Sequence, residues 1–369
     1  METVPIGIIG CGNISAAYLR TAQTFRILEV LACADALPER AEARAQEFGV
    51  PKACSVAELL ADPEIRIVVN LTTPQSHAVV SLAAIAAGKH VYTEKPLAVT
   101  REEGRRILEA AREKGVRIGC APGTFLGGGL QTCRRLIDEG AIGRPVACTA
   151  FMMSHGHESW HPDPAYYYQV GAGPMFDMGP YYLTALTTLL GPVRRITGSA
   201  GIQIPQRTIT SQPKYGQQIV VETPDHVTGT IEFANGAIGT IITTFATWYS
   251  QLPFGEIYGT DGTLRLPNPN SLAGPVMLAK AGEREWHEVA LTHGHADSRN
   301  MWGIGVADLA HALVAERPHR ATGEQGYHVL DIMQGFLDAA QRGQHYELAS
   351  TMERPAPLPN DLAEDVLDG

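Results

Sequence analysis

Lys95 and the stretch FDMGPYY at positions 176–182 carry the side chains best suited to proton transfer in this sequence. The stretch fits the first turn of a helix, where Asp177 and Tyr181, four residues apart, lie near one side. Lysine and tyrosine ordinarily have pKa values of ~10.4 and ~10, so either needs a pKa lower by about 3 to act as a base near neutrality. Burial lowers the pKa of a lysine, and a neighbouring ammonium lowers that of a phenol. Taken alone, however, Asp177 also fits a helix N-cap and Tyr181 a half-buried packing residue.

Lys95 stands at the end of an expected strand, HVYTE at positions 90–94, and Pro96 follows it. Proline disfavours helical angles at the residue before it and ends the strand, so Lys95 is presented at the strand's carboxyl end. Doubly wound folds bind their ligands at that end of the sheet. A solvent-exposed ion pair between Glu94 and Lys95 is ordinarily the more common arrangement, but the strand context favours a ligand-binding role.

Residues 1–122 alternate short apolar strands with helical stretches. This order predicts right-handed βαβ crossovers and an α/β domain of the Rossmann type, with a doubly wound parallel sheet. Residues 123–369 instead contain longer strands with two-residue periodicity, joined by turns such as Asn235-Gly236. They predict an α+β C-terminal domain with an open, mostly antiparallel sheet, which would bind substrate and form oligomers.

The end of the chain contains two further helical stretches, at 305–317 and 324–343. We expect them to pack on the two domains or to close the chain. The proline-rich tail at 353–365 is expected to be a surface extension.

The segment GCGNIS follows the first expected strand and opens a helix, which is typical of a dinucleotide-binding turn. Gly10 permits the tight turn, Gly12 lets the backbone approach a pyrophosphate, and the helix start supplies N–H groups for its charge. Asp35 ends the next strand 20 residues after Ser15, where a carboxylate can accept hydrogen bonds from both ribose hydroxyls. It would repel a 2'-phosphate, so NAD is favoured over NADP, although Arg40 is close in sequence. The expected cofactor contacts here are Gly10, Gly12, Asn13, Ile14 and Asp35.

A longer segment at positions 68–100, VVNLTTPQSHAVVSLAAIAAGKHVYTEKPLAVT, resembles the glucose-fructose oxidoreductase, inositol dehydrogenase and MocA family. The shared features are a Thr-Pro turn, a histidine, an AGKHV strand entrance and an EKP triplet. The resemblance extends to GAGPMFDMGPYYL and covers nearly the whole chain in domain order. It implies that Lys95 reaches both the nicotinamide ribose and the substrate, while Glu94 and Pro96 shape the cleft. The further cofactor contacts that it implies are Thr72, Thr73, Pro74, His77 and Glu94.

Many members of that family have a histidine four residues after the aspartate, where this chain has Tyr181. Some members, including glucose-fructose oxidoreductases and dimeric dihydrodiol dehydrogenases, are similar to this chain in having a tyrosine there. The tyrosine leaves the identity of the proton carrier open. Because a neighbouring ammonium lowers the pKa of a phenol, we expect Tyr181 to be the acid/base and Lys95 to polarise the substrate oxygen, with the exchanged assignment left open. Asp177 would hold Lys95 or a neighbouring substrate hydroxyl.

The stretch SHGHESWHPDPAYYYQ combines aromatic and polar side chains that suit a sugar-binding wall. Trp160 offers a flat face to a pyranose ring, and histidines offer contacts to hydroxyls. Such a cluster could bind a metal, but it lacks an HxxxH or HExxH helical spacing, so no metal is expected. A solvated loop is the remaining alternative. The expected substrate contacts are His155, His157, Trp160, His161, Asp177 and Tyr181.

Composition excludes several classes of protein. The net charge is -10 and no basic block occurs, so nucleic acid is not an expected partner. Six cysteines without a CxxC pair fit buried thiols in a reducing compartment, and no apolar run reaches the roughly 18 residues of a membrane helix. We expect a cytoplasmic protein.

Strands such as AIGTIITTF, with apolar or β-branched residues on both faces, predict a homodimer or homotetramer formed through an open sheet face.

These features predict an NAD(P)-dependent oxidoreductase that transfers a hydride between nicotinamide and a secondary hydroxyl or ketone of a sugar, glycoside or cyclitol. One alternative is a glycosidase or lyase that retains NAD and oxidises a ring hydroxyl only transiently. Another is a non-catalytic sensor of a dinucleotide or sugar. Net consumption of free NAD separates the dehydrogenase from the first alternative, and NADH binding without turnover would favour the second.

We expect the protein to bind NADH at least several-fold more tightly than NADPH, because Asp35 meets the adenosine ribose. The Asp35→Ser variant should lose this preference. Fluorescence titration of both proteins with both nucleotides measures it. Tighter binding of NADPH to the wild-type protein would show that Asp35 does not select the cofactor.

Overall fold

The computed structural model describes residues 2–360, 362–363 and 365–368. In the N-terminal part, six described strands form a parallel sheet in the order β3-β2-β1-β4-β5-β6. The strand order reverses between β1 and β4, and ligands of such sheets bind at the carboxyl ends of the strands on either side of this point. The predicted Rossmann domain is confirmed. Its strands are β1 (Val4–Ile9), β2 (Leu28–Ala34), β3 (Lys52–Cys54), β4 (Ile67–Asn70), β5 (His90–Thr93) and β6 (Ile118–Cys120).

Helices connect these strands, and local sequence signals set their ends. Ser55 and Thr100 each accept a hydrogen bond from the backbone three residues on and complete capping boxes at the starts of α3 and α5. Gly115 ends α5 in the left-handed conformation that favours glycine. The helices are α1 (Ser15–Thr24), α2 (Pro38–Phe48), α3 (Val56–Ala61), α4 (Pro74–Ala86) and α5 (Arg101–Lys114).

The C-terminal part contains a mixed sheet of nine described strands in the order β16-β15-β14-β13-β7-β12-β11-β8-β17. Only the β7–β12 pairing among them is parallel, so the predicted, mostly antiparallel sheet is confirmed. Asn235-Gly236 forms the expected turn between β11 and β12. The strands are β7 (Pro145–Met153), β8 (Val193–Gly201), β11 (His226–Phe233), β12 (Ile238–Thr244), β13 (Gly255–Gly259), β14 (Gly262–Arg265), β15 (Val276–Lys280), β16 (His287–Val289) and β17 (Tyr346–Glu347). A separate two-stranded arm pairs β9 (Gln206–Thr208) with β10 (Gln218–Val220).

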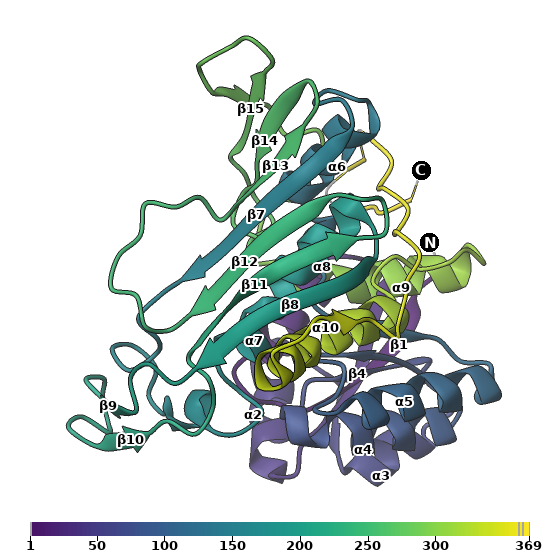
Figure 1. Cartoon of the computed structure of the whole chain (residues 1–369). Helices are drawn as coiled ribbons and strands as arrows, with labels where there is room; N and C mark the ends of the chain where they lie inside the picture. Colours follow the sequence, from purple (N-terminus) through teal and green to yellow (C-terminus); the bar gives the residue numbers. More distant parts are fainter. Residues whose placement is uncertain (1, 361, 364, 369) are drawn as a thin grey trace.

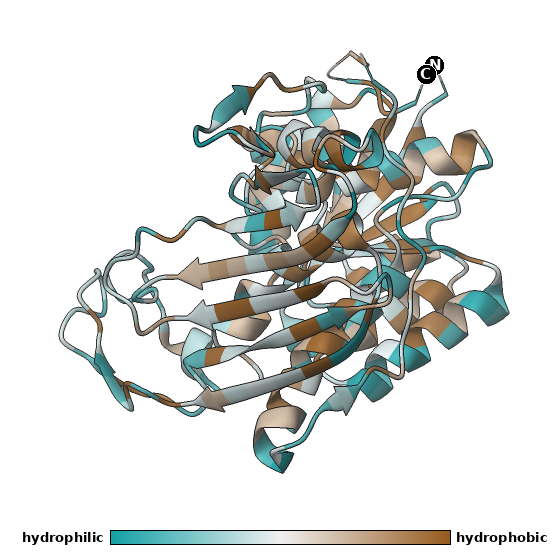
Figure 2. Ribbon diagram, turned by 45° about the horizontal axis from the view of Figure 1, so that its top comes forward, coloured by the Kyte–Doolittle hydropathy of each residue, from teal (hydrophilic) through white to brown (hydrophobic). Residues whose placement is uncertain are grey.

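In the view of Figure 1 the helices of this part lie behind the large sheet or below its β8 edge, and the front face of the sheet is open. Along β12, Ile238 and Thr240 are exposed, whereas Gly239 and Ile241 are buried. Figure 2 shows apolar residues interspersed with polar ones along the strands of this sheet. Association of two or more chains through the open face remains a prediction. The helices are η1 (Thr124–Leu126), α6 (Gly128–Asp138), η2 (Ala165–Tyr168), α7 (Pro174–Asp177), α8 (Gly179–Leu190), α9 (Ile304–Val314) and α10 (Gly323–Arg342).

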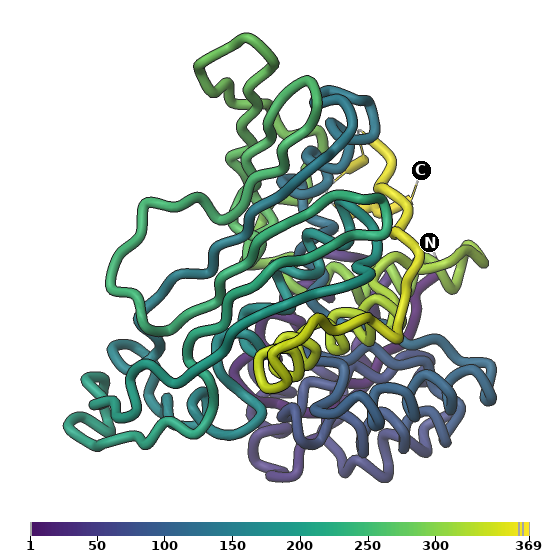
Figure 3. The backbone as a smooth tube through the Cα atoms, viewed as in Figure 1, coloured from purple at the N-terminus to yellow at the C-terminus, as the bar shows by residue number. Residues whose placement is uncertain are grey.

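Helices α9 and α10 return to the N-terminal sheet, as the path of the chain in Figure 3 shows. The backbone N–H of Cys120 in β6 donates a hydrogen bond to the carbonyl of Ala321, at 3.1 Å. Gly119, the middle residue of β6, forms an isolated bridge with Thr322. The predicted late helices therefore exist and pack against both parts of the molecule.

The expectation for the tail at 353–365 was wrong in part, because its described residues pack against the body of the protein. Leu358 is buried, and its N–H donates to Oε1 of Gln131 at 2.8 Å. The Arg134 guanidinium donates to the carbonyl of Pro355, also at 2.8 Å. The prolines of the tail indicate an extended chain. They do not indicate that a carbonyl and a leucine of this chain contact Arg134 and Gln131 of the protein body. The tail positions Asp361 and Glu364 lie outside the described residues.

The composition led us to expect buried cysteine thiols and no membrane-spanning helix. Within the described chain the six cysteines are free thiols, and all are buried except Cys54, which is half-buried. None of the described helices is long and apolar enough to span a bilayer.

The turn between β1 and α1 uses its two glycines differently. Gly10 has a φ of +100°, and a Cβ there would lie 2.6 Å from the backbone of Leu71. A Cβ on Gly12 would meet nothing within 4 Å. Gly10 is therefore required by the fold, whereas Gly12 borders open space at the start of α1.

Substitution of the two glycines should separate these roles. We expect Gly10→Ala to lower the free energy of unfolding by roughly 1 to 3 kcal/mol, because the side chain is strained at this φ and meets backbone. Gly12→Ala should change it by no more than about 0.5 kcal/mol. Urea denaturation measures both values. Equal losses of stability would contradict the distinction.

Candidate functional site

The site is centred on an ion pair between the two domains. Lys95 follows β5, and Asp177 is the last residue of α7. The Lys95 ammonium donates hydrogen bonds to Oδ1 of Asp177 at 2.9 Å and to the Asp177 carbonyl at 2.6 Å. Only 17% of the Lys95 side chain and 15% of the Asp177 side chain are exposed. The predicted contact of Asp177 with Lys95 is present in the structure.

The other carboxylate oxygen of Asp177 faces His157, in the loop that follows β7. Nε2 of His157 lies 3.2 Å from Oδ2 of Asp177. The N-cap alternative for Asp177 is therefore wrong: α8 begins after Met178, and no side chain caps it. The carboxylate is directed to Lys95 and His157 instead.

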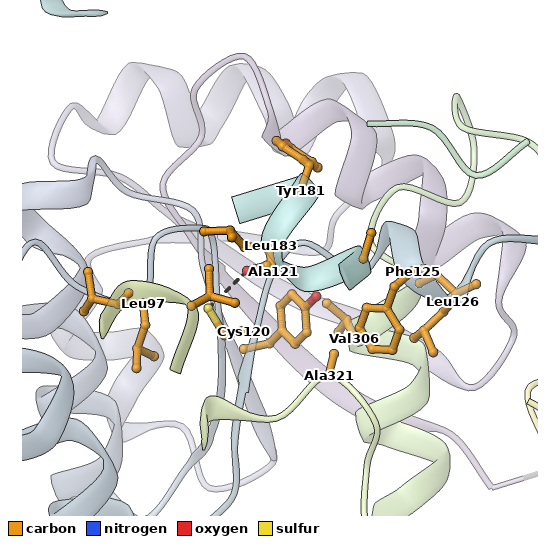
Figure 4. Close-up of a cluster of buried hydrophobic side chains, with 14 of the residues drawn as sticks. Leu97, Cys120, Ala121, Phe125, Leu126, Tyr181, Leu183, Val306 and Ala321 are labelled. Carbon is orange, nitrogen blue, oxygen red and sulfur yellow. Dashed lines mark hydrogen bonds between the residues drawn. The ribbon is translucent and has the colours of Figure 1, made fainter. Parts of the chain in front are cut away.

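Tyr181 lies in the first turn of α8, and its ring centroid is 5.3 Å from Nζ of Lys95. Its side chain is buried, with Trp302 at 6.0 Å between ring centroids. Figure 4 shows Tyr181 at one edge of a group of buried apolar side chains that includes Leu183. The structure thus brings together the three residues predicted to be catalytic, although packing accounts for much of the environment of Tyr181.

The electrostatic environment differs from the expected one. Burial raises the pKa of Tyr181 above its ordinary value, and the opposing effect of the Lys95 charge does not overcome it. Burial alone would lower the pKa of Lys95, but the charge of Asp177 outweighs it and the pKa lies above its usual range. Burial alone would raise the pKa of Asp177, yet Lys95 and His157 hold it well below its usual range. Near neutrality, Lys95 and Tyr181 are both proton donors.

The loop around the EKP triplet is braced by several buried contacts. Glu94 accepts a hydrogen bond from the Tyr18 hydroxyl at 2.8 Å and another from the Lys95 N–H at 2.9 Å. The ring nitrogens of His77 lie 2.7 Å from the Pro96 carbonyl and 3.0 Å from the Thr72 carbonyl. Burial lowers the pKa of His77, so a neutral ring donates to one of these two carbonyls.

The buried ring of His77 therefore connects the loop after β4, through Thr72, to the loop after β5, through Pro96. Thr72 is half-buried and donates to Oδ1 of Asn70 at 2.7 Å, while Thr73 is exposed and Pro74 begins α4. The predicted place of these residues along the cofactor remains a prediction.

The start of α1 has the features of an anion site. Ile14 precedes the helix without a side-chain cap, and Asn13 is exposed, so no side chain occupies the helix start where a pyrophosphate would bind. Asp35 directly follows β2 and accepts hydrogen bonds from the N–H of Cys11 at 2.7 Å and from the N–H of Leu37 at 2.9 Å. A carboxylate has about four acceptor positions, so Asp35 can still bind ribose hydroxyls.

Arg44 of α2 was missed at this turn. It donates to Oγ of Ser15 at 3.1 Å and to the Gly12 carbonyl at 3.3 Å, and it also pairs with Glu47. Arg40, the arginine considered from the sequence, is exposed. One helical turn separates the two arginines, so they lie near the same side of α2, and helix periodicity could not show which of them reaches the turn.

The histidine-rich stretch divides between the site and its surroundings. The ring of His157 stacks on Tyr167 at 3.6 Å, and the ring of His155 stacks on exposed Trp248 at 3.4 Å. Trp160 is 62% exposed and approaches the half-buried His161 edge-on. Of the histidines and Trp160 in the predicted wall, His157 contacts the ion pair. Trp160 and His161 belong to the same run of aromatic rings as His157, whereas His155 is stacked on Trp248 instead.

Glu158 points away from this wall. Its carboxylate accepts hydrogen bonds from Arg207 at 2.8 Å and from the Tyr168 hydroxyl at 2.7 Å. Arg207 comes from the two-stranded arm and was not predicted, because its partners are distant in sequence. No group of three or more His, Cys, Asp or Glu side chains in the described residues is arranged to hold a metal ion.

Comparison with known proteins identifies relatives of the whole chain. Residues 4–121 match a family model described as an oxidoreductase family with an NAD-binding Rossmann fold, and residues 130–265 match the GFO/IDH/MocA C-terminal domain. The 1,5-anhydro-D-fructose reductase of Ensifer adhaerens is 30% identical over 353 residues, which are 93% of this chain and 98% of that protein. The levoglucosan dehydrogenase of Pseudarthrobacter phenanthrenivorans is 28% identical over 84% of this chain and 86% of its own.

Solved structures share the whole fold. An NAD-binding oxidoreductase from Klebsiella pneumoniae superimposes with a TM-score of 0.83 at 23% identity, and a levoglucosan dehydrogenase in complex with NADH does so with 0.81 at 23%. Each alignment covers 95% of this chain and 100% of the other. The family resemblance seen in the EKP and FDMGPYY segments therefore holds over both domains: the chain belongs to the glucose-fructose oxidoreductase, inositol dehydrogenase and MocA family of oxidoreductases, with an NAD-binding Rossmann domain.

Proposed function

We propose that the protein is an NAD-dependent dehydrogenase or reductase that interconverts a secondary hydroxyl and a ketone on a sugar, glycoside or cyclitol. The observation that carries the proposal is the pairing of Lys95 with Asp177 next to Tyr181. These groups lie at the carboxyl end of β5, beside the switch point of the Rossmann sheet. Proton donors at that place suit a reaction in which a substrate oxygen gains or loses a proton.

The residues present fit the dinucleotide. Open space at Gly12, an uncapped helix start and the Asp35 carboxylate match a pyrophosphate followed by a ribose diol. When bound, the nicotinamide supplies the hydride acceptor or donor. The protein supplies the proton and the orientation of the substrate.

Lys95 has three N–H donors, and Asp177 accepts hydrogen bonds from two of them. We assign the third to the substrate oxygen. In this arrangement the ammonium stabilises negative charge that develops on the oxygen when the carbonyl is reduced. Tyr181 supplies the proton in this proposal. The variants below distinguish it from the alternative in which Lys95 supplies the proton.

The substrate class is supported by the aromatic rings that extend outward from His157. Trp160 and Tyr166 are exposed large aromatic side chains, at 62% and 49%, and such faces suit a sugar ring. Two relatives carry the names 1,5-anhydro-D-fructose reductase and levoglucosan dehydrogenase. A panel of D-glucose, myo-inositol, levoglucosan and 1,5-anhydro-D-fructose, assayed with NAD or NADH, tests the proposal. Net formation or consumption of NADH with at least one of them is the expected result.

The proton carrier is tested by three variants, assayed on the fastest sugar of the panel. Tyr181→Phe should lower turnover by roughly 10² to 10⁴, with almost no change in NADH affinity. Tyr181→His should retain part of the activity, since a histidine can also transfer a proton. Lys95→Met should reduce turnover and disturb nicotinamide positioning together. If Tyr181→Phe turns over within about threefold of wild type at every pH, Tyr181 only packs the helix start and Lys95 carries the proton alone.

The pH dependence should differ between the two directions. The pKa values of Tyr181 and Lys95 lie above their ordinary values, so both groups are protonated near pH 7. Oxidation of an alcohol needs one of them deprotonated, so its kcat/KM should rise about tenfold per pH unit between about pH 7 and 9. Reduction of the ketone uses the protonated form and should stay level over that range. An oxidation rate that is already constant at pH 7 would contradict the raised pKa values.

A further inference from the structure

Asp177 is bonded from two sides by residues of different domains. Lys95, from the N-terminal domain, binds Oδ1, and His157, from the loop after β7 in the C-terminal domain, faces Oδ2. We propose that His157 is a positioning residue for the reaction: its Nε2–H fixes the Asp177 carboxylate, which in turn fixes the Lys95 ammonium toward the substrate oxygen. This inference rests on the proposed function and assigns His157 a role other than the predicted substrate contact.

The His157 ring has little freedom to move. It stacks on Tyr167 with ring centroids 3.6 Å apart and 9° between the planes. Phe245 approaches it edge-on at 4.8 Å. Only 10% of the side chain is exposed. A ring held in this way directs Nε2 at the carboxylate without needing the carboxylate to orient it.

The hydrogen bonds determine the tautomer. A carboxylate with a low pKa is an acceptor, so the proton of the contact is on Nε2 of His157. Nδ1 is buried and has no hydrogen-bond partner among the residues that the structure describes. The contacts therefore place a ring hydrogen on Nε2, and among the described residues Nδ1 faces no acceptor that would bind a second one.

The loop that carries His157 is also fixed. The backbone N–H of His157 donates a hydrogen bond to the Tyr168 hydroxyl at 3.2 Å. The guanidinium of Arg207 binds the His155 carbonyl and the Glu158 carboxylate, both at 2.8 Å, and Asp225 at the same distance. The residues before and after His157 are thus held by one buried arginine, which places the imidazole for Asp177.

Removal of the imidazole would leave Oδ2 of Asp177 buried without that donor. A carboxylate bonded only through Oδ1 can rotate about its last bond, and Lys95 would then keep a fixed contact only with the Asp177 carbonyl, which leaves its ammonium less firmly oriented toward the substrate oxygen. Turnover should then fall more than the affinity for NADH, because the contact lies outside the predicted pyrophosphate and adenosine-ribose sites. This split between turnover and cofactor binding distinguishes positioning from a general loss of folding.

The test compares His157→Phe, which can keep the stacking on Tyr167, with His157→Gln, which keeps an N–H donor of similar reach. Assayed on the fastest sugar of the panel above, His157→Phe should lower kcat by roughly 10- to 100-fold, the effect of losing one hydrogen bond to a charged group. His157→Gln should recover most of that loss. His345→Phe, at an exposed histidine after α10, is the matched control and should behave as wild type. NADH titration and thermal unfolding of each variant report cofactor binding and folding.

A double-variant cycle shows whether His157 acts through Asp177. If it does, His157→Phe added to Asp177→Asn should lower kcat by no more than about threefold further, because both changes remove the same contact. Full additivity of the two losses, or a His157→Phe enzyme as active as wild type, would overturn the inference.

Nitrogen NMR of the histidine rings gives a readout that does not depend on activity, with His157→Phe identifying the signal. Wild-type His157 should show the tautomer protonated on Nε2, and Asp177→Asn should shift its signals. The tautomer protonated on Nδ1, or signals unaffected by Asp177→Asn, would overturn the inference. If wild-type protein turns over no sugar of the panel, the proposed function fails, while the NMR result still decides whether His157 fixes Asp177.

Discussion

The arrangement of the site depends on one buried carboxylate. A carboxylate with so little exposure is stable as an ion only when it is paired and hydrogen-bonded, and Asp177 obtains those partners from two different domains. The same contacts fix how the α7–α8 segment sits against the end of β5. Loss of Lys95 or of Asp177 alone would leave the other charge buried and unpaired, so the chemistry and the domain arrangement cannot be varied independently at this point.

Much of the fold could be predicted because it is encoded locally. Alternating strands and helices, the Gly10 turn and the EKP triplet each leave a pattern within a few residues, and each predicted element is present. The short strand β3 and the two-residue β17 were not predicted, since three or fewer residues carry no recognisable periodicity. The packed tail was also misjudged, because the partners of Leu358 and Pro355 lie more than 200 residues earlier in the chain.

The proximity of the three residues expected to be catalytic was predicted, whereas their electrostatics were not. Lys95, Asp177 and Tyr181 were found through spacing and resemblance, and the structure brings them together. Their protonation could not be inferred, because the burial of Tyr181 arises from α8 packing into the core, which tertiary structure alone determines. His157 was assigned to a sugar-binding wall for the same reason: a sequence shows that a histidine is near the site, but not which of its neighbours it meets.

The return of the late helices to the N-terminal sheet affects how the chain is made. During synthesis, the segment up to β6 leaves the ribosome long before Ala321 and α10, which complete the edge of that sheet. Until then β6 lacks a neighbour on one side, and open strand edges are where newly made chains associate wrongly. The NAD-binding domain, although first in sequence, is therefore finished among the last parts of the molecule, and a chain truncated before residue 321 would expose this edge.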